Sequence, residues 1–193
     1  MDDIELAERL AIDLDGAFEA LVRGHVDRLY AVALRVTGDA ADAEEVAQDA
    51  LVRAYRALER YESARIASLR LRPWLAAIAV NLARNRRRRG WDRVPPLSLE
   101  VASGAAHPRA PDADRPEELA TRRVERERWA AALACLPERY RVPLVLRHVD
   151  DLSYDEMAEA LGRPEGTLRA QVHRGLALLR AAWDAAEREE QPA

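Results

Sequence analysis

The chain has 193 residues; 33% are charged, 49% are hydrophobic, and the formal net charge is −4. This length fits one or two domains, and the composition excludes a collagen, a disulfide-stabilised miniprotein and a chain disordered throughout. Cys135 is the only cysteine, so no internal disulfide can form, and we expect a buried thiol in a reducing, cytoplasmic compartment. The acidic N-terminus does not fit a secretory signal. The sequence has no run of eighteen consecutive apolar residues, so we expect no membrane-spanning helix.

Charge is segregated along the chain. Residues 1–16 carry six acidic residues against one arginine, and residues 38–62 carry seven against three. Residues 65–93 carry nine arginines against one aspartate. Such a surplus is typical of a surface that binds a polyanion, although a solvated charged helix gives the same pattern.

A proline-rich segment divides the chain into two halves. Five of the ten prolines fall in residues 94–116, which predicts a linker. We expect an acidic segment over residues 1–15, a first domain over 16–93, a second over 117–186 and an acidic tail over 187–193. No alternating strand pattern occurs, so the predicted fold class is all-α, with two small helical domains joined by the linker.

Apolar spacing predicts three helices in the first half. They run near residues 16–36, near 40–60, and from Pro73 into the arginine cluster. Gly38 should end the first of them. We expect residues 62–72 to form a loop or a distorted turn.

The second half is also predicted to be helical. One helix follows the linker, and another follows Pro137 and contains Pro143, which predicts a kink or a late start. The next helix has the strongest local signals: Ser153 and Glu156 fit a capping box, and Gly162 fits a C-cap.

The last two helices fit a helix-turn-helix with a glycine-containing turn. An apolar stripe begins at Leu168, so the other side of the final helix presents Arg169, Ala170, Gln171, His173 and Arg174. Arginine reads guanine or phosphate and glutamine pairs with adenine, so these residue types fit a DNA groove. An ordinary helical hairpin with a solvated face is the alternative.

A second polar face lies on the arginine-rich helix. Asn81, Arg84, Asn85 and Arg88 are spaced by three and four residues, so they share one side. Arginines neutralise phosphate, amides bond to base edges, and aromatic side chains nearby can stack on unpaired bases. For Trp74 we expect core packing instead.

No enzyme or metal signature occurs in the sequence. The four histidines lack metal-ligand spacing, and no glycine-rich phosphate loop is present. Acidic pairs such as Glu44 and Glu45 fit a solvated face better than a catalytic pair. We therefore expect no catalytic residue, no metal ligand and no cofactor.

Three segments resemble regions of bacterial RNA polymerase sigma factors of the sigma-70 family. The core-polymerase-binding helix of region 2.2 is similar to DAADAEEVAQDALVRAYRAL (39–58). The promoter-melting and −10-reading helix of regions 2.3 and 2.4 is similar to RPWLAAIAVNLARNRRRR (72–89). Region 4, which reads the −35 element, resembles LPERYRVPLVLRHVDDLSYDEMAEALGRPEGTLRAQVHRGLALLR (136–180). The order fits the extracytoplasmic-function (ECF) group, which has only regions 2 and 4 and a linker.

The resemblance implies a partner for each polar surface. The face set against the clamp coiled coil of the largest polymerase subunit corresponds to Glu45, Gln48, Asp49 and Arg53. The −10-reading residues correspond to Asn81, Arg84, Asn85 and Arg88. The −35-reading residues correspond to Arg163, Thr167, Arg169, Ala170, Gln171, His173 and Arg174. Residues 62–72 correspond to the family's base-capturing loop, and the second domain would contact the polymerase flap.

The sequence therefore predicts an alternative sigma factor. It would bind core RNA polymerase and direct promoter-specific initiation by recognising −35 duplex and melted −10 DNA, without being an enzyme. An anti-sigma factor is a further expected partner, and a membrane is not. Family members often carry serine and arginine where Ala170 and Gln171 stand.

Two other functions compete with this prediction. A stand-alone dimeric helix-turn-helix regulator would explain residues 153–180 but would leave the 39–58 helix without a role. A protein-binding helical adaptor would leave the arginines as a solvated face, and salt-sensitive DNA binding separates it from the other two functions.

Overall fold

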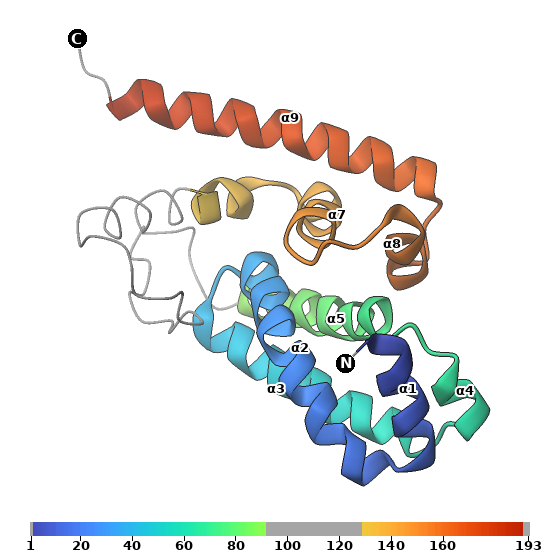
Figure 1. The fold of residues 1–193 in the computed structure, drawn as a ribbon. Helices are drawn as coiled ribbons and strands as arrows, with labels where there is room; N and C mark the ends of the chain where they lie inside the picture. Colours follow the sequence, from blue (N-terminus) through green and yellow to red (C-terminus); the bar gives the residue numbers. More distant parts are fainter. Residues whose placement is uncertain (1, 92–128, 191–193) are drawn as a thin grey trace, which may run out of the picture.

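The computed structural model describes residues 2–91 and 129–190, and within these ranges all regular structure is helical (Figure 1). The predicted linker, the start of the second domain and the last three residues lie outside the described residues. Residues 187–190 of the predicted tail are described as the end of a helix.

The first half is a helical bundle built on α2 (Leu14–Thr37), α3 (Ala40–Leu58) and α5 (Leu71–Trp91), which pack pairwise. Gly38 ends α2 in the left-handed conformation (φ 80°), which glycine adopts without the steric penalty of a side chain. The Asp39 side chain then caps α3 by accepting from the Asp42 amide at 2.8 Å. The three helices predicted for this half are confirmed.

Two short elements in this half were not predicted. Within the acidic segment 1–15, α1 (Asp3–Ile12) forms a helix that packs against α2 and α4. Its apolar residues face inward; the buried ones are Leu6, Ala7 and Leu10. The expected loop 62–72 contains the five-residue helix α4 (Ser63–Ala67), and α5 begins at Leu71, two residues before Pro73.

The second half contains a helix that ends at residue 135, then α7 (Glu138–His148), α8 (Tyr154–Leu161) and α9 (Glu165–Glu190). The expected late start at Pro143 is wrong, because α7 begins at Glu138 and continues through the proline. Cys135 is exposed rather than buried, so that expectation is also wrong. It lies one residue before the buried Leu136, and the helix turns the thiol outward.

The helix-turn-helix signals are confirmed in α8 and α9. Ser153 caps α8, and the Glu156 carboxylate accepts from the Ser153 amide at 2.8 Å, which completes the capping box. Gly162 ends α8 at φ 62°. Farther along α9, a side chain on Gly175 would lie 3.0 Å from Leu144 Cδ1 and 3.3 Å from the Tyr140 carbonyl, so the glycine allows α9 to pack closely on α7.

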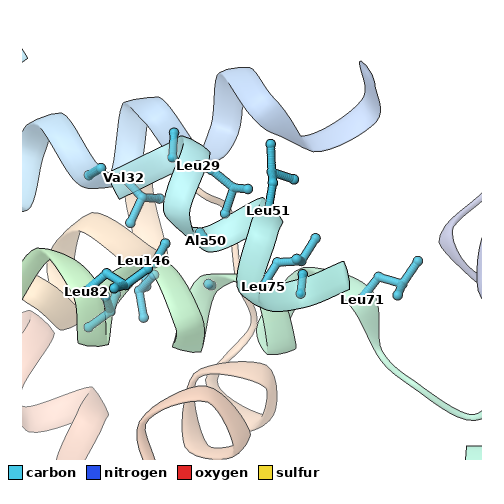
Figure 2. Close-up of a cluster of buried hydrophobic side chains, with 14 of the residues drawn as sticks. Leu29, Val32, Ala50, Leu51, Leu71, Leu75, Leu82 and Leu146 are labelled. Atoms are coloured by element: carbon cyan, nitrogen blue, oxygen red, sulfur yellow. The ribbon is translucent and has the colours of Figure 1, made fainter. Parts of the chain in front are cut away.

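The two halves pack directly against each other. α7 lies on α2, and α8 lies on α5. Most buried side chains belong to one cluster that crosses between the halves, and Figure 2 draws Leu146 of α7 in it together with Leu75 and Leu82 of α5. Leu146 is fully buried. This docking positions the second half over the arginine-rich helix of the first.

Candidate polymerase and nucleic-acid interfaces

The predicted polymerase-binding face lies on the outer side of α3. Glu45, Gln48, Asp49 and Arg53 are exposed, whereas Ala47, Ala50, Leu51 and Ala54 on the opposite side are buried. The helix therefore places all four predicted residues at the surface, where a partner can reach them.

Part of this acidic face is bonded to α5. Arg86 Nε lies 2.7 Å from Asp42 Oδ1, and its Nη2 forms an ion pair with Glu45. The hydrogen bond to Asp42 raises the pKa of Arg86, so the cation stays charged. Arg86 thus fixes α5 against α3. Among the acidic residues Asp42, Glu45 and Asp49, Asp49 lies farthest along α3 from this contact.

The predicted −10 face on α5 is present but not uniformly accessible. Asn81 and Asn85 are exposed, and Arg88 donates to Asn85 Oδ1. Arg84 is only 21% exposed because its Nε lies 2.8 Å from Glu138 Oε1 at the start of α7. The two asparagines are therefore available to a ligand, while Arg84 is held by the second half.

Aromatic side chains flank the predicted base-capturing loop. The Arg65 guanidinium lies 3.7 Å from the centre of the Tyr61 ring, and that ring lies 6.3 Å from Trp74. Trp74 is half-buried and packs against the core, as expected. The stacked Tyr61 and Arg65 precede α5, and their separation of four residues is the signal that could have indicated the pair.

In the helix-turn-helix, the start of α9 presents the predicted DNA-reading residues. Thr167, Arg169, Ala170, His173 and Arg174 are exposed. Arg169 forms an ion pair with Glu165 at 3.2 Å, and its guanidinium lies 4.4 Å from the centre of the Tyr154 ring. These contacts hold the Arg169 side chain across the junction of α8 and α9.

Gln171 differs from its neighbours. It is half-buried, and its Oε1 accepts a hydrogen bond from Arg163 Nη1 at 3.3 Å. Gln171 and Arg163, both predicted as −35 residues, are therefore paired with each other in the unbound protein.

Other kinds of site have little support among residues 2–91 and 129–190. No group of three or more His, Cys, Asp or Glu side chains is arranged to hold a metal ion there. No helix in that part of the chain has the length and apolarity needed to cross a membrane. What the described surface offers is a set of polar, arginine-containing helix faces.

Comparison with known proteins identifies both halves. Residues 21–93 match the family model of sigma-70 region 2, and residues 126–179 match that of sigma-70 region 4. The ECF RNA polymerase sigma factor SigW of Bacillus subtilis is 31% identical over 176 residues, which is 85% of this chain and 87% of that protein. SigE of Mycolicibacterium smegmatis, also an ECF RNA polymerase sigma factor, is 33% identical over 166 residues; the match covers 85% of this chain but only 60% of that relative's length.

The fold is also similar to a solved structure. CnrH, determined in complex with the cytosolic domain of CnrY, superposes with a TM-score of 0.67 at 26% identity. The superposition covers 95% of this chain and 97% of CnrH, so it includes both halves.

Proposed function

Because this chain belongs to the ECF group of the sigma-70 family, we propose that its polar helix faces have separate partners, with α3 binding core polymerase, α5 binding the melted −10 strand and α9 binding the −35 duplex. As an alternative sigma factor it directs transcription initiation with RNA polymerase. The observation that supports the proposal most is the placement of the predicted polar faces on different helices of one chain, two in the first half and one in the second.

The α3 face has the chemistry for a protein partner. Glu45, Gln48, Asp49 and Arg53 combine two acids, an amide and a cation on one exposed side. Such a mixed charge pattern gives orientation and specificity against a complementary surface. The clamp coiled coil of the largest polymerase subunit is the partner that the family resemblance implies.

The α5 face has the chemistry for unpaired bases. The exposed amide of Asn81 offers a donor and an acceptor, and that of Asn85 offers its NH2 donors while its oxygen accepts from Arg88, so both can bond to base edges once the strand is melted. Arg88 beside them can neutralise a phosphate. Tyr61 and Arg65 provide planar groups next to the same strand path, which suits base stacking.

The α9 face suits a major groove. Its N-terminal turns carry exposed Arg169, His173 and Arg174, which match the residue types that read base edges and phosphates. Each DNA contact alone is small. When both halves are held on one polymerase, the second contact forms at high effective concentration, which strengthens promoter binding without new contacts.

The remaining assignments follow from the same function. The polymerase carries out the chemistry, so we assign this chain no catalytic residue and no cofactor. We place it in the cytoplasm, where core polymerase and promoter DNA are available. An anti-sigma factor is a further expected partner, and CnrH offers a parallel because it was determined in complex with a second protein.

Run-off transcription with core polymerase on a random promoter library tests the proposal. We expect promoter-dependent transcripts, and we expect Asn81→Ala with Asn85→Ala to impair strand opening more than closed-complex binding, because the amides act on exposed bases. Permanganate footprinting measures opening and gel shift measures closed-complex binding. Glu19→Ala, on the exposed side of α2, is a matched control. Undiminished melting in the asparagine variant would contradict the −10 assignment.

A further inference from the structure

The N-terminal helix α1 is attached to α2 at both of its ends. At the C-terminal end, the Asp13 amide donates to the Arg9 carbonyl at 2.9 Å, and the Asp13 side chain accepts from the Gly16 amide at 3.0 Å. One residue thus ends α1 and caps α2. At the N-terminal end, Asp3 Oδ1 lies 3.4 Å from Nε2 of the buried His25 on α2. These contacts hold α1 in one orientation on the bundle.

The inner side of α1 is apolar and faces α4. Leu6 and Leu10 of α1 are 4% and 1% exposed, and they belong to the same buried cluster as Ile66 of α4. Figure 1 shows the two helices side by side, and α4 packs mainly against α1. α1 therefore provides the surface on which α4 lies.

The short helix α4 cannot fix its own position. It has five residues, whereas an isolated helix in water is marginal below about 12–15 residues. Its N-cap residue, Glu62, forms no side-chain capping bond. Ile66 is the one buried residue among its five. The helix therefore depends on tertiary packing, and most of that packing comes from α1.

One member of the stacked pair beside the −10 face lies on α4. Arg65 is exposed and directly precedes the buried Ile66, because adjacent residues of a helix point to different sides. The Arg65 guanidinium lies 3.7 Å from the centre of the Tyr61 ring, which precedes α4 and packs against the core. A displacement of α4 would move the guanidinium off the ring, and the two groups would no longer form one planar surface.

We propose that α1 is a positioning element for −10 recognition, which holds α4 so that Arg65 stays stacked on Tyr61 and the pair can take an unpaired base. This inference rests on the proposed function, in which the pair stacks on the melted strand. Leu10 and Ile66 are the positioning residues, and both are buried, so neither touches the DNA. α1 thus contributes to promoter opening through packing alone.

The lifetime of the open complex tests this role, with the full chain bound to core polymerase on a promoter taken from the library. Promoters with single abasic sites along the melted −10 strand remove one base at a time. The site that shortens the wild-type lifetime identifies the captured base. We expect a change of about tenfold, as for the loss of one stacked base. In Arg65→Ala with Tyr61→Leu, the same abasic site should cause no further change.

Leu10→Ala removes packing between α1 and α4 without altering the stacked pair itself. We expect it to shorten the lifetime about tenfold on intact DNA and to add no loss on the abasic promoter, where the stacked base is already missing. Ile66→Ala should give the same pattern from the α4 side. Leu10→Met, which nearly conserves the side-chain volume, should keep the wild-type lifetime. Leu29→Ala, at a buried leucine of α2, is the matched control and should affect both promoters equally.

The outcomes separate this inference from the proposed function. Leu10→Ala with the wild-type lifetime, or with equal losses on intact and abasic promoters, would show that α1 only completes the core and would overturn the inference alone. Circular dichroism checks the helices, and if Leu10→Ala does not fold, Ile66→Ala decides in the same way. A wild type whose lifetime no abasic site changes would refute base capture, and with it both the proposed stacking role and this inference.

Discussion

Gln171 illustrates how one side chain changes the reading of a recognition helix. Helical spacing predicts a groove-facing glutamine, whereas in the structure Gln171 is half-buried and its Oε1 accepts a hydrogen bond from Arg163. Reading a base would require this hydrogen bond to break or to rotate with the bound DNA. The residue that family members often carry here, arginine, could not accept a bond from Arg163.

We predict that Gln171→Arg shifts the −35 preference from adenine toward guanine at one position. Glutamine pairs bidentately with adenine and arginine with guanine, and a good pair discriminates by about 1–3 kcal/mol. A promoter selection with the wild type and the variant measures the preference. Glu19→Gln, at an exposed residue of α2 outside the recognition helix, changes the net charge equally and is the control. Identical preferences with a uniform change in strength would mean that position 171 does not read sequence.

His25 offers a second prediction for a single residue. It is 5% exposed in α2, and its Nε2 lies 3.4 Å from Asp3 Oδ1 of α1. Burial lowers the pKa of His25, and the nearby Asp3 opposes this shift only in part. His25 therefore binds a proton less readily in the folded protein than in the unfolded chain. The free energy of unfolding that this group contributes is fully present above the ordinary histidine pKa and decreases as the pH falls below about 6.5.

We expect His25→Gln to lose less stability at acidic pH than the wild type does. Thermal unfolding at about pH 7.5 and at about pH 5.5 should show a larger decrease in Tm for the wild type than for the variant. His173→Gln, at an exposed position on α9, should leave the wild-type difference unchanged. Equal decreases in wild type and His25→Gln would show that His25 does not couple folding to pH.

The acidic residues of α3 have two different roles. Asp42 and Glu45 bind Arg86 and so hold α5, whereas Asp49 is exposed one turn farther along. Reversing Glu45 would place a cation against Arg86 and disturb the bundle as well as the outer surface. Asp49 is therefore the better residue at which to test binding of α3 to core polymerase.

Asp49→Arg should weaken binding to core polymerase by at least about tenfold, because a reversed charge at an interface meets a like charge in the partner. The fold should survive, since Asp49 lies outside the core. Co-purification with core polymerase measures binding, and circular dichroism checks the helices. Glu19→Arg on α2 is the control. If Asp49→Arg binds core polymerase as tightly as the wild type does, this side of α3 does not contact the polymerase.

The two halves of the protein share one apolar cluster. Leu146 of α7 is fully buried within it, and the cluster continues from α2, α3 and α5 into α7, α8 and α9. The stability of each half is therefore coupled to docking on the other. Unfolding of this protein should therefore be more cooperative than unfolding of two tethered domains that do not pack against each other.

Leu146→Ala tests this coupling. We expect a loss of about 2–5 kcal/mol in the free energy of unfolding, as for other buried leucines, together with a second resolved transition. Urea unfolding followed by circular dichroism measures both. Leu178→Ala, at a leucine that is 43% exposed, should change stability by less than about 0.5 kcal/mol. A wild type that already unfolds in two separate transitions would show that the halves are energetically independent, and little loss of stability in Leu146→Ala would show that Leu146 does not couple them.

The local elements could be predicted from residue spacing alone. The apolar spacing of α2, α3 and α9, the capping box at Ser153 and the glycines at 38 and 162 act over one or two helical turns, so they can be recognised without a structure. The resemblance to sigma factors rests on the same local segments. Which residues share a helix face, including Asn81 with Asn85, follows from spacing alone.

Which of those residues are accessible depends on how the helices pack. Arg28 and Asp150 are separated by 122 residues, and Arg86 and Asp42 by 44. An arginine looks the same in the sequence whether it is solvated, bound to a neighbouring helix or held by the other half. Its partner depends on how the helices pack, and that packing is set by the buried apolar cluster rather than by any spacing of charges. For this reason the −10 face was predictable, while its partial occupation by the second half was not.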